Sequence, residues 1–370
     1  MCWENDLIRV LHVLDEISTN SGKSAVVMNY YSELDHKKFT FDFMLNKDVD
    51  AKTREYIEGN GSQIYLMPGL KAANLFKYLK DLKTFYKEHE YLIIHGHVAN
   101  SAVFYLGLAR KKIPFRIIHS HNTMASDVPW KRMRNFILTR FIKSVANRYI
   151  ACSKEAASFL FGKKENVVIF PNAVDVNSYI FDQVKRDYIR AKLGIAEKLV
   201  IGHVGRFCPQ KNHDFLIDVF HEVYAKNRET VLLLIGGGEL YEVVVRKAER
   251  LGLKDAVRFI GISDRVADYM NAMDVFAMPS LFEGLPLAAV EAQASGLPVF
   301  LSENISRETD ITGKTVFLPL EIPAWVDALI TPRMNDRINS GNKVKQSRFN
   351  IETQVGQLCN YYEELLKIGL

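Results

Sequence analysis

The chain has 370 residues, of which 48% are hydrophobic and 25% are charged, with a net charge of +5 and four cysteines. The length favours about two domains, and the composition is that of a globular protein rather than a disordered or fibrous one. No apolar run reaches the roughly 18 residues of a membrane span, acids interrupt the first ten positions, and the cysteines lack metal-ligand spacing. We therefore expect no integral membrane protein, no secretory signal and no structural zinc site.

The first half of the chain alternates short apolar runs with helical patterns. Leu75, Tyr78, Leu82 and Tyr86 recur at helical spacing, which predicts a helix within 72–89. Repeated alternation of strand and helix is typical of an α/β fold with a doubly wound parallel sheet. The predicted strands of this half are 9–14, 41–45, 63–66, 91–95, 116–119, 148–152 and 167–170.

A second alternation follows the polar stretch 176–198, which we interpret as the connection between two domains. Strands are predicted over 199–204, 231–235 and 257–260, and helices over 213–224 and 351–366. The sequence thus predicts a first domain over 1–175 and a second over 176–350.

The stretch 274–301 reads as a strand, a loop, a helix and a second strand. Pro286 suits the first turn of the helix and Gly296 its end, so the stretch predicts one right-handed crossover unit of a parallel sheet. The helix is lined with small apolar residues, yet it carries Glu291, and Glu283 lies in the loop before it. A single buried acid has a structural explanation, in which it caps a backbone group or meets an arginine.

Two acids eight residues apart favour a ligand instead. Eight helical residues rise about 12 Å, which is similar to the reach from one sugar ring to the other in a nucleoside diphosphate sugar. The amides of Gly284 and Leu285 beside the positive end of the helix would suit the diphosphate.

This stretch resembles the Glu–seven residues–Glu motif of retaining glycosyltransferases of family 4, which have the GT-B fold of two Rossmann-like domains facing a central cleft. The resemblance implies that Glu283 and the amides of Gly284 and Leu285 hold the donor sugar, that Pro286 also lies in the donor site, and that Glu291 binds ribose hydroxyls. It covers nearly the whole chain and is strongest over 205–299. It also implies that the final helix, within 351–370, packs back onto the first domain.

Further donor-binding residues follow from the same resemblance. Gly205 and Arg206 with Lys211 are similar to a family loop whose cations hold the donor diphosphate, although alone they would be solvated surface charges. Two fixed cations and a helix N-terminus stabilise the charge of the leaving group, so we expect no metal ion and no other cofactor. The resemblance also implies that Gly22, Gly237 and Ile260 lie near the nucleotide, although a glycine run alone more often marks a tight turn.

The stretch 119–122 ends a predicted strand and contains two histidines. A histidine at a strand end is more often a structural residue, but the resemblance places His121 beside the donor sugar, where it would hydrogen-bond a hydroxyl and help position the acceptor. His97 and Asn122 are expected on the acceptor side. The expected catalytic set is His121, Arg206, Lys211 and Glu283, without an assigned general base.

The segment 110–148 holds ten basic residues and one acid. One interpretation of 130–145 is a packed helix with a solvated basic face. The other is an interfacial helix at an anionic membrane, with about 1 kcal/mol per cation near the surface; its membrane-facing residues would be Trp130, Lys131, Arg132 and Arg134. Nucleic acid is disfavoured, because no nucleic-acid-binding fold is recognised.

The sequence therefore predicts a retaining, metal-independent hexosyltransferase that uses a nucleoside diphosphate sugar, with UDP favoured. The stretches 28–31 and 119–122 resemble enzymes of bacterial capsular and exopolysaccharide synthesis, which implies a saccharide or polyprenyl-diphosphate-linked acceptor and a cytoplasmic enzyme peripheral to the cell membrane. Two alternatives remain open: a nucleotide-sugar 2-epimerase of the same fold, and a non-catalytic nucleotide-sugar-binding partner of a transferase.

Overall fold

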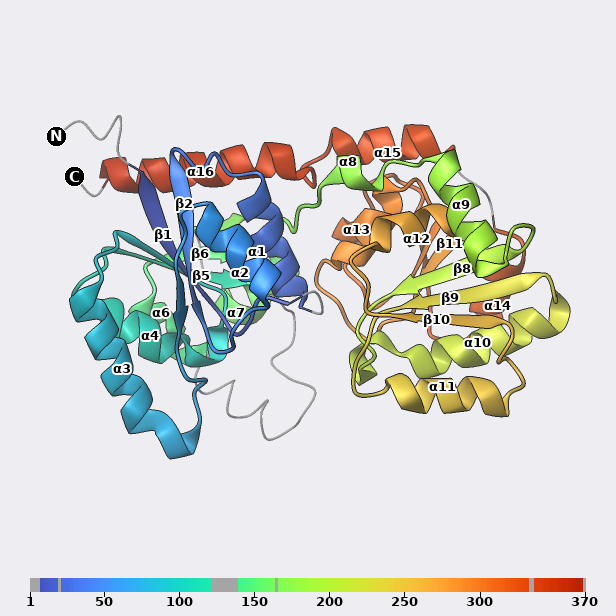
Figure 1. Ribbon diagram of the computed structural model, residues 1–370, viewed down its shortest axis with the longest axis horizontal. Coiled ribbons are helices and arrows are strands. Elements are labelled where there is room, and N and C mark those ends of the chain that lie inside the picture. Colours follow the sequence, from blue (N-terminus) through green and yellow to red (C-terminus); the bar gives the residue numbers. More distant parts are fainter. Residues whose placement is uncertain (1–6, 19–20, 122–138, 164–165, 333–335, 369–370) are drawn as a thin grey trace. The chain divides into compact units, whose positions relative to one another are not determined.

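The computed structural model describes residues 7–18, 21–121, 139–163, 166–332 and 336–368 (Figure 1). The chain forms two compact units, one of residues 1–171 with 351–370 and the other of residues 172–350. The first division falls after Pro171, a few residues before the boundary expected at 175. Each unit is an α/β structure built on its own parallel sheet, so the predicted fold class is confirmed.

The described residues of the first unit form a seven-stranded parallel sheet in the order β3-β2-β1-β4-β5-β6-β7. Helices lie on both faces, which is why its strands are nearly continuous apolar runs rather than alternating ones. The strands are β1 (Ile8–Leu14), β2 (Phe39–Leu45), β3 (Ile64–Leu66), β4 (Ile93–Gly96), β5 (Phe115–Ser120), β6 (Arg148–Ala151) and β7 (Val167–Ile169). The helices are α1 (Gly22–Ser32), α2 (Ala51–Gly59), η1 (Ala72–Asn74), α3 (Leu75–Glu88), η2 (Ala99–Ser101), α4 (Ala102–Ala109), α6 (Ile142–Val145) and α7 (Lys154–Phe161).

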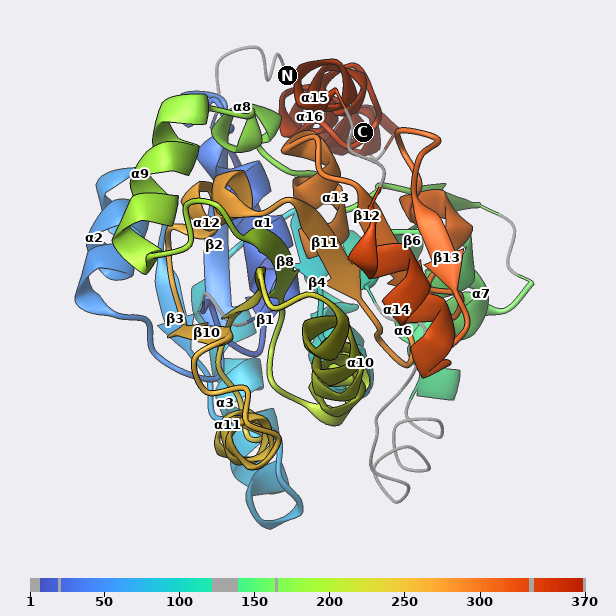
Figure 2. The same ribbon diagram turned by 90° about the vertical axis from the view of Figure 1, so that its right-hand side faces the viewer.

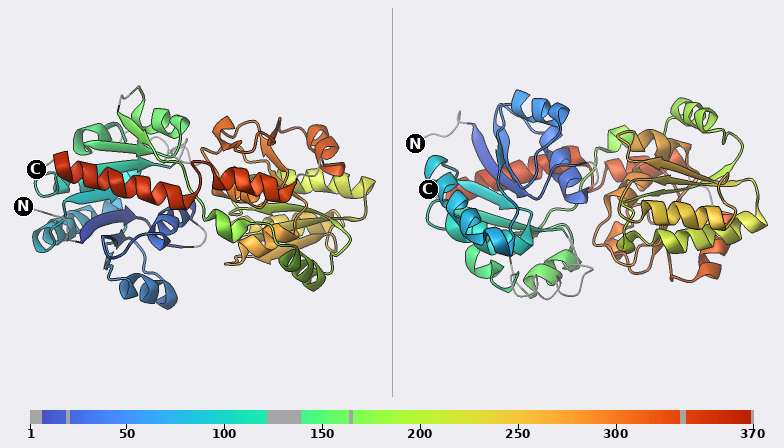
Figure 3. Two further views of the ribbon diagram at one scale, coloured as in Figure 1. Left: turned by 90° about the horizontal axis from the view of Figure 1, so that it is seen from above. Right: turned by 60° about the horizontal axis from the view of Figure 1, so that its bottom comes forward.

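The last helix, α16 (Ile351–Ile368), belongs to the first unit, where it runs along the sheet and packs beside α1 (Figure 3). Its buried side chains Leu358, Tyr362 and Leu365 recur at helical spacing, and the Tyr362 hydroxyl lies 2.6 Å from His95 Nδ1 at the end of β4. The apolar stripe of the helix therefore completes the core of the unit that the chain built first.

The described residues of the second unit form a six-stranded parallel sheet in the order β10-β9-β8-β11-β12-β13. Figure 2 faces this unit, with α12 and α13 over one face of the sheet and α10 and α14 over the other. The strands are β8 (Leu199–Val204), β9 (Thr230–Ile235), β10 (Val257–Gly261), β11 (Val275–Met278), β12 (Val299–Ser302) and β13 (Val316–Leu318). The helices are α8 (Val176–Tyr179), α9 (Gln183–Leu193), η3 (Pro209–Lys211), α10 (His213–Lys226), α11 (Tyr241–Arg250), α12 (Val266–Ala272), α13 (Leu287–Ala294), η4 (Arg307–Thr309), α14 (Ile322–Ile330) and α15 (Arg337–Lys345).

The stretch 176–198, interpreted from its polarity as a connection, is instead two capped helices of the second unit. Asp175 and Asp182 cap α8 and α9 with their side chains, and Gly194 ends α9 in the left-handed region. Two of the polar residues that suggested a linker form ion pairs with a buried acid. Arg186 and Arg190 lie 2.5 and 3.2 Å from the carboxylate of Asp274, which is 7% exposed.

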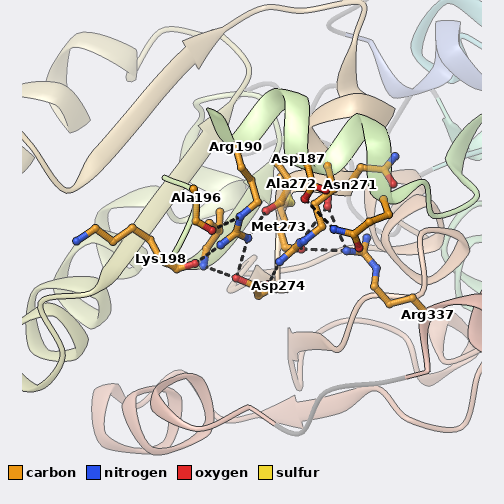
Figure 4. Close-up of polar contacts among 12 residues, drawn as sticks. Asp187, Arg190, Ala196, Lys198, Asn271, Ala272, Met273, Asp274 and Arg337 are labelled. Atoms are coloured by element: carbon orange, nitrogen blue, oxygen red, sulfur yellow. Dashed lines mark hydrogen bonds and ion pairs between the residues drawn. The ribbon is translucent and has the colours of Figure 1, made fainter. Parts of the chain in front are cut away.

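The Asp274 network ties α9 to the start of β11 and β8 (Figure 4). The carboxylate also accepts a hydrogen bond of 2.8 Å from the Val200 amide. Arg337 donates to the carbonyls of Met270, Asn271, Met273 and Ser295, and burial, followed by the neighbouring Arg186, lowers its pKa to about 9. A single carboxylate therefore compensates a cluster of buried guanidinium groups.

We expect Asp274→Asn to lower the free energy of unfolding by about 3 kcal/mol, because removing one member of a buried ion pair leaves the other charges uncompensated. Urea unfolding followed by circular dichroism measures the change. The control is Glu229→Gln, which breaks the exposed pair with Lys198 and should cost less than about 0.5 kcal/mol. Equal effects of the two substitutions would contradict this account of the network.

Candidate functional site

The candidate donor site lies at the carboxyl ends of β8 and β11 in the second unit. These two strands are neighbours at the centre of the sheet, and the chain proceeds from β8 to one side and from β11 to the other. The carboxyl ends of strands at such a reversal point are the usual binding position in open α/β sheets. The loops that leave these strands hold most of the predicted donor-binding residues.

Backbone contacts join the two loops to each other. The Leu281 amide donates to the Gln210 carbonyl over 2.8 Å, and the Gln210 side chain donates back to the Phe282 carbonyl over 3.0 Å. Asn212, in the left-handed conformation with φ of 56°, donates from its side chain to the Pro279 carbonyl over 3.2 Å. The loop geometry is thus set within the unit itself.

Lys211 and Glu283, predicted from separate motifs, form an ion pair with 2.6 Å between Nζ and Oε1. The two side chains are only 16% and 12% exposed. A short bridge between Glu283 and Ile305 holds the backbone of the acid beside the end of β12. The pair lies just before Pro286, the N-cap of α13, so a cation, a carboxylate and a helix N-terminus occur together.

Arg206 lies in the same loop but in a different setting. Its guanidinium is 58% exposed and lies 3.0 Å from the carboxylate of Glu239, which is itself 50% exposed. An exposed pair of this kind contributes little to stability. Arg206 can therefore exchange Glu239 for an anionic ligand at low energetic cost.

The glycines around these loops have a structural explanation. A Cβ at Gly236, where φ is +136°, would lie 2.1 Å from the Gly205 carbonyl oxygen, and one at Gly238 would lie 2.5 Å from the Phe207 carbonyl oxygen. The Phe207 amide donates to the Gly237 carbonyl over 3.0 Å. The glycine run thus allows the loop that carries Arg206 to approach the backbone of residues 236–238 closely. This is a structural role for the glycines, in line with the interpretation as a tight turn.

The remaining predicted nucleotide residues lie around the same loops. Gly205 leaves room for Lys211, since a Cβ there would lie 3.3 Å from Lys211 Cδ. Ile260, in β10, is partly buried against the apolar core beneath α12. Gly284 and Leu285 follow the ion pair in the loop before α13.

Glu291 is partly accessible on α13, and its hydrogen-bond partner is Tyr179 of α8. Burial raises the pKa of Glu291 to about 7, and the Tyr179 hydrogen bond and the Lys211 charge only partly offset it. Among the described residues, the Glu291 carboxylate thus contacts neither a backbone group nor an arginine, the two partners that its structural explanation named. The charge of Lys211 favours the ionised form of that carboxylate.

Sequence reasoning missed two residues of this site. Tyr179 lies in the stretch interpreted as a linker, and no pattern pointed to it. Asn172 donates from its side chain to the Leu285 carbonyl over 2.9 Å, and its Oδ1 has no partner among the described residues. Asn172 belongs to the stretch 171–175 at the boundary between the units, and that position was the signal that could have identified it.

The first unit holds the other predicted residues. Gly22 begins α1, where Ser21 caps the Ser24 amide, and a Cβ at Gly22 would meet nothing within 4 Å. His97 is buried and lies behind the partly exposed His121, with 2.8 Å between His97 Nδ1 and His121 Nε2. Five predicted residues lie outside the described part of the chain: Asn122, Trp130, Lys131, Arg132 and Arg134.

Family models match both units. Residues 21–178 match the model described as Glycosyltransferase Family 4, and residues 185–316 match the model described as Glycosyl transferases group 1. The chain is 32% identical over 369 residues to EpsF of Bacillus subtilis (strain 168), which is named as a glycosyltransferase, with 96% of each chain covered. The chain belongs to glycosyltransferase family 4. The resemblance read from Glu283 and Glu291 is thereby confirmed.

Two further comparisons extend over nearly the whole of this glycosyltransferase. An Escherichia coli protein named as UDP-Gal:alpha-D-GlcNAc-diphosphoundecaprenol alpha-1,3-galactosyltransferase is 23% identical over 383 residues, with 97% of each chain covered. The crystal structure of Anabaena HepE in complex with UDP and glucose superposes with a TM-score of 0.79 at 18% identity, covering 96% of this chain and 99% of HepE. The second likeness establishes the GT-B fold. Within the described residues, no helix combines the length and apolarity of a membrane span.

The raised pKa of Glu291 predicts a pH-dependent cost to stability. Because the unfolded chain loses this proton near pH 4.5 and the folded protein only near pH 7, the fold loses stability as pH rises between these values. Glu291→Gln should therefore stabilise the ligand-free protein at pH 8 by up to about 3 kcal/mol and change little at pH 4.5. Urea unfolding at both pH values measures the effect.

The control for this substitution is Glu249→Gln on the exposed face of α11. It should leave the pH dependence of the parent protein unchanged. An equal gain for Glu291→Gln at pH 4.5 and at pH 8 would assign the effect to packing rather than to the buried charge.

Proposed function

We propose that this glycosyltransferase transfers a hexose from a UDP-sugar to a lipid-linked saccharide, with retention of the anomeric configuration and without a metal ion at the donor diphosphate. The observation that carries the proposal is the buried Lys211–Glu283 pair directly before α13. In this assignment Lys211 and the first amides of α13 bind the diphosphate, and Glu283 accepts hydrogen bonds from sugar hydroxyls.

The chemistry follows from these groups. As the anomeric carbon–oxygen bond breaks, the diphosphate gains negative charge, and fixed positive groups stabilise that charge. In a front-face reaction the acceptor oxygen bonds to the same face of the anomeric carbon, and its proton passes to the leaving phosphate oxygen. Glu291 accepts from the ribose hydroxyls, whose hydrogen bonds favour its ionised form and would lower its pKa. His121 hydrogen-bonds a sugar hydroxyl.

The choice of UDP and of a lipid-linked acceptor rests on relatives and on surface charge. The E. coli relative is named for UDP-Gal and for an acceptor on diphosphoundecaprenol, and HepE was solved with UDP. In the first unit Phe141 is 57% exposed, and five cations between residues 110 and 143 are exposed as well: Arg110, Lys111, Lys112, Arg140 and Lys143. Such a surface supports a peripheral position at an anionic membrane on the cytoplasmic side, in polysaccharide synthesis.

Donor binding is tested by thermal shift without added metal, using UDP, GDP, ADP and CMP with their sugars. A UDP-sugar at about one hundred times its Kd should stabilise the folded protein by about 2.7 kcal/mol. Lys211→Met should abolish the shift, because the cation at the diphosphate is lost. The matched control is Lys198→Met, at the opposite end of β8, where the lysine pairs with the exposed Glu229. No shift with any nucleotide would refute the donor site.

Metal independence is tested on the dialysed enzyme by following transfer to an undecaprenyl-diphosphate-linked sugar. The initial rate should be the same within about twofold with and without millimolar Mg²⁺ or Mn²⁺, because protein groups already neutralise the diphosphate. A tenfold stimulation by either ion would overturn the assignment of Lys211 and Arg206.

The same assay separates the two alternative functions. Conversion of the donor to a second sugar nucleotide without acceptor would identify a 2-epimerase. Donor binding that depends on Lys211, with no turnover of any donor and acceptor pair, would favour a non-catalytic partner. The stereochemistry of the product, read by NMR of the new glycosidic bond, tests retention.

A further inference from the structure

Five of the ten histidines of the chain gather at the carboxyl ends of three adjacent strands in the first unit. His12 and His95 are neighbours in the register of β1 and β4. His95 and His97 are two positions apart, as are His119 and His121, so each pair of side chains lies on one face of the sheet. The five are His12, His95, His97, His119 and His121. The proposed transfer reaction uses His121 and leaves the others without an assigned role.

The rings form two short hydrogen-bonded chains. In the first chain His12 Nδ1 lies 3.0 Å from His97 Nε2, and His97 Nδ1 lies 2.8 Å from His121 Nε2. In the second, His119 Nδ1 lies 3.3 Å from His95 Nε2, and His95 Nδ1 lies 2.6 Å from the Tyr362 hydroxyl. All but His121 are buried, and His12 Nε2 and His119 Nε2 have no hydrogen-bond partner among the described residues. A buried nitrogen without a partner carries a desolvation cost.

Burial disfavours the protonated form of His12, His95, His97 and His119. Burial, followed by the charges of neighbouring histidines, holds the pKa of His95, His97 and His119 well below the usual value, and burial alone lowers that of His12 to about 3. Neutral imidazole is the form that binds metal ions.

We propose that His97, His119 and His121 bind one divalent transition-metal ion of the zinc class. One nitrogen from each of these residues lies within 4.8 Å of the others. A tetrahedral ion with bonds of 2.0–2.1 Å requires about 3.3 Å between ligand nitrogens, so the 2.8 Å between His97 Nδ1 and His121 Nε2 opens by a small ring movement. The partnerless His119 Nε2 supplies the third ligand.

The other two histidines fit a supporting layer. With His97 bound through Nδ1, its Nε2–H donates to His12 Nδ1; with His119 bound through Nε2, its Nδ1–H donates to His95 Nε2. His95 Nδ1–H then donates to Tyr362, so one set of tautomers is consistent with these contacts, and the ion replaces only the contact between His97 and His121. Ligating histidines usually have their second nitrogen hydrogen-bonded in this way.

The alternative trio of His12, His95 and His97 fits less well, although its nitrogens also lie within 4.8 Å of one another. Both nitrogens of His95 already have partners, so ligation there would break a contact to His119 or Tyr362. All three residues are also buried, whereas His121 is partly exposed.

The donor set also excludes the ions that usually serve diphosphates. Imidazole nitrogen suits Zn²⁺, Co²⁺ or Ni²⁺, whereas Mg²⁺ and Ca²⁺ require oxygen ligands. The proposed site therefore does not replace Lys211 and Arg206, and it stands independently of the donor-site assignment.

The experiment is calorimetric titration of the chelator-treated, dialysed full-length protein with ZnCl₂ in the absence of nucleotide. We expect one ion per chain, and Co²⁺ in its place should give the visible absorption of a tetrahedral site. His119→Gln and His121→Gln should each weaken binding at least about tenfold, and His95→Gln about 10–100-fold through loss of the supporting contact. The matched control is His221→Gln, an exposed histidine of the second unit, which should bind as the parent does.

Two further measurements distinguish loss of the metal site from loss of folding. The thermal shift produced by UDP reports the donor site, so a variant that keeps this shift and loses zinc has lost only the metal site. His121→Gln changes a partly exposed residue and should fold even if a buried substitution does not. Absence of stoichiometric zinc binding by the parent, or unchanged binding in both His119→Gln and His121→Gln, would overturn the proposal.

Discussion

The ion pair between Lys211 and Glu283 is the interaction on which the donor site depends. It connects two loops that the chain forms about seventy residues apart, and it can do so because β8 and β11 are adjacent at the centre of the sheet. At 16% and 12% exposure the pair is largely desolvated, so either charge without the other would be costly. A ligand that approaches finds a cation and a carboxylate already positioned, and positioning in advance reduces the reorganisation needed during reaction.

The two buried acids of the second unit, Asp274 and Glu291, differ in how far their charges are compensated. Asp274 is surrounded by guanidinium groups and a backbone amide, so its burial is compensated and it fastens α9 to the sheet. Among the described residues, the Tyr179 hydroxyl and the Lys211 charge only partly compensate Glu291, and its raised pKa reflects the remaining cost of burial. A compensated charge is typical of structure, whereas an uncompensated one in a ligand-binding region is typical of function.

The first unit contrasts with the second because its polar cluster contains imidazoles in place of ion pairs. Several neutral imidazole rings can be buried together without the cost of isolated charges, provided that their nitrogens form hydrogen bonds. The hydrogen-bonded chains from His12 and from His95 meet this condition almost completely. Among the described residues, one nitrogen of His12 and one of His119 remain without a partner, and the nitrogen of His119 is a ligand of the proposed metal ion.

The sequence by itself determined the fold class, the strands of both sheets except the short edge strand β13, and the family. Apolar strands and helical spacing are local patterns, and the motif of Glu283 and Glu291 lies within nine consecutive positions. Only the tertiary structure decided which side chains meet. The pairing of Lys211 with Glu283, the contact of Tyr179 with Glu291 and the hydrogen bond from Asn172 to Leu285 all join residues distant in sequence. The stretch 176–198 was misread for the same reason: polarity is the signal of a linker, yet here it compensates an acid nearly ninety residues away, and no local pattern contains that partner.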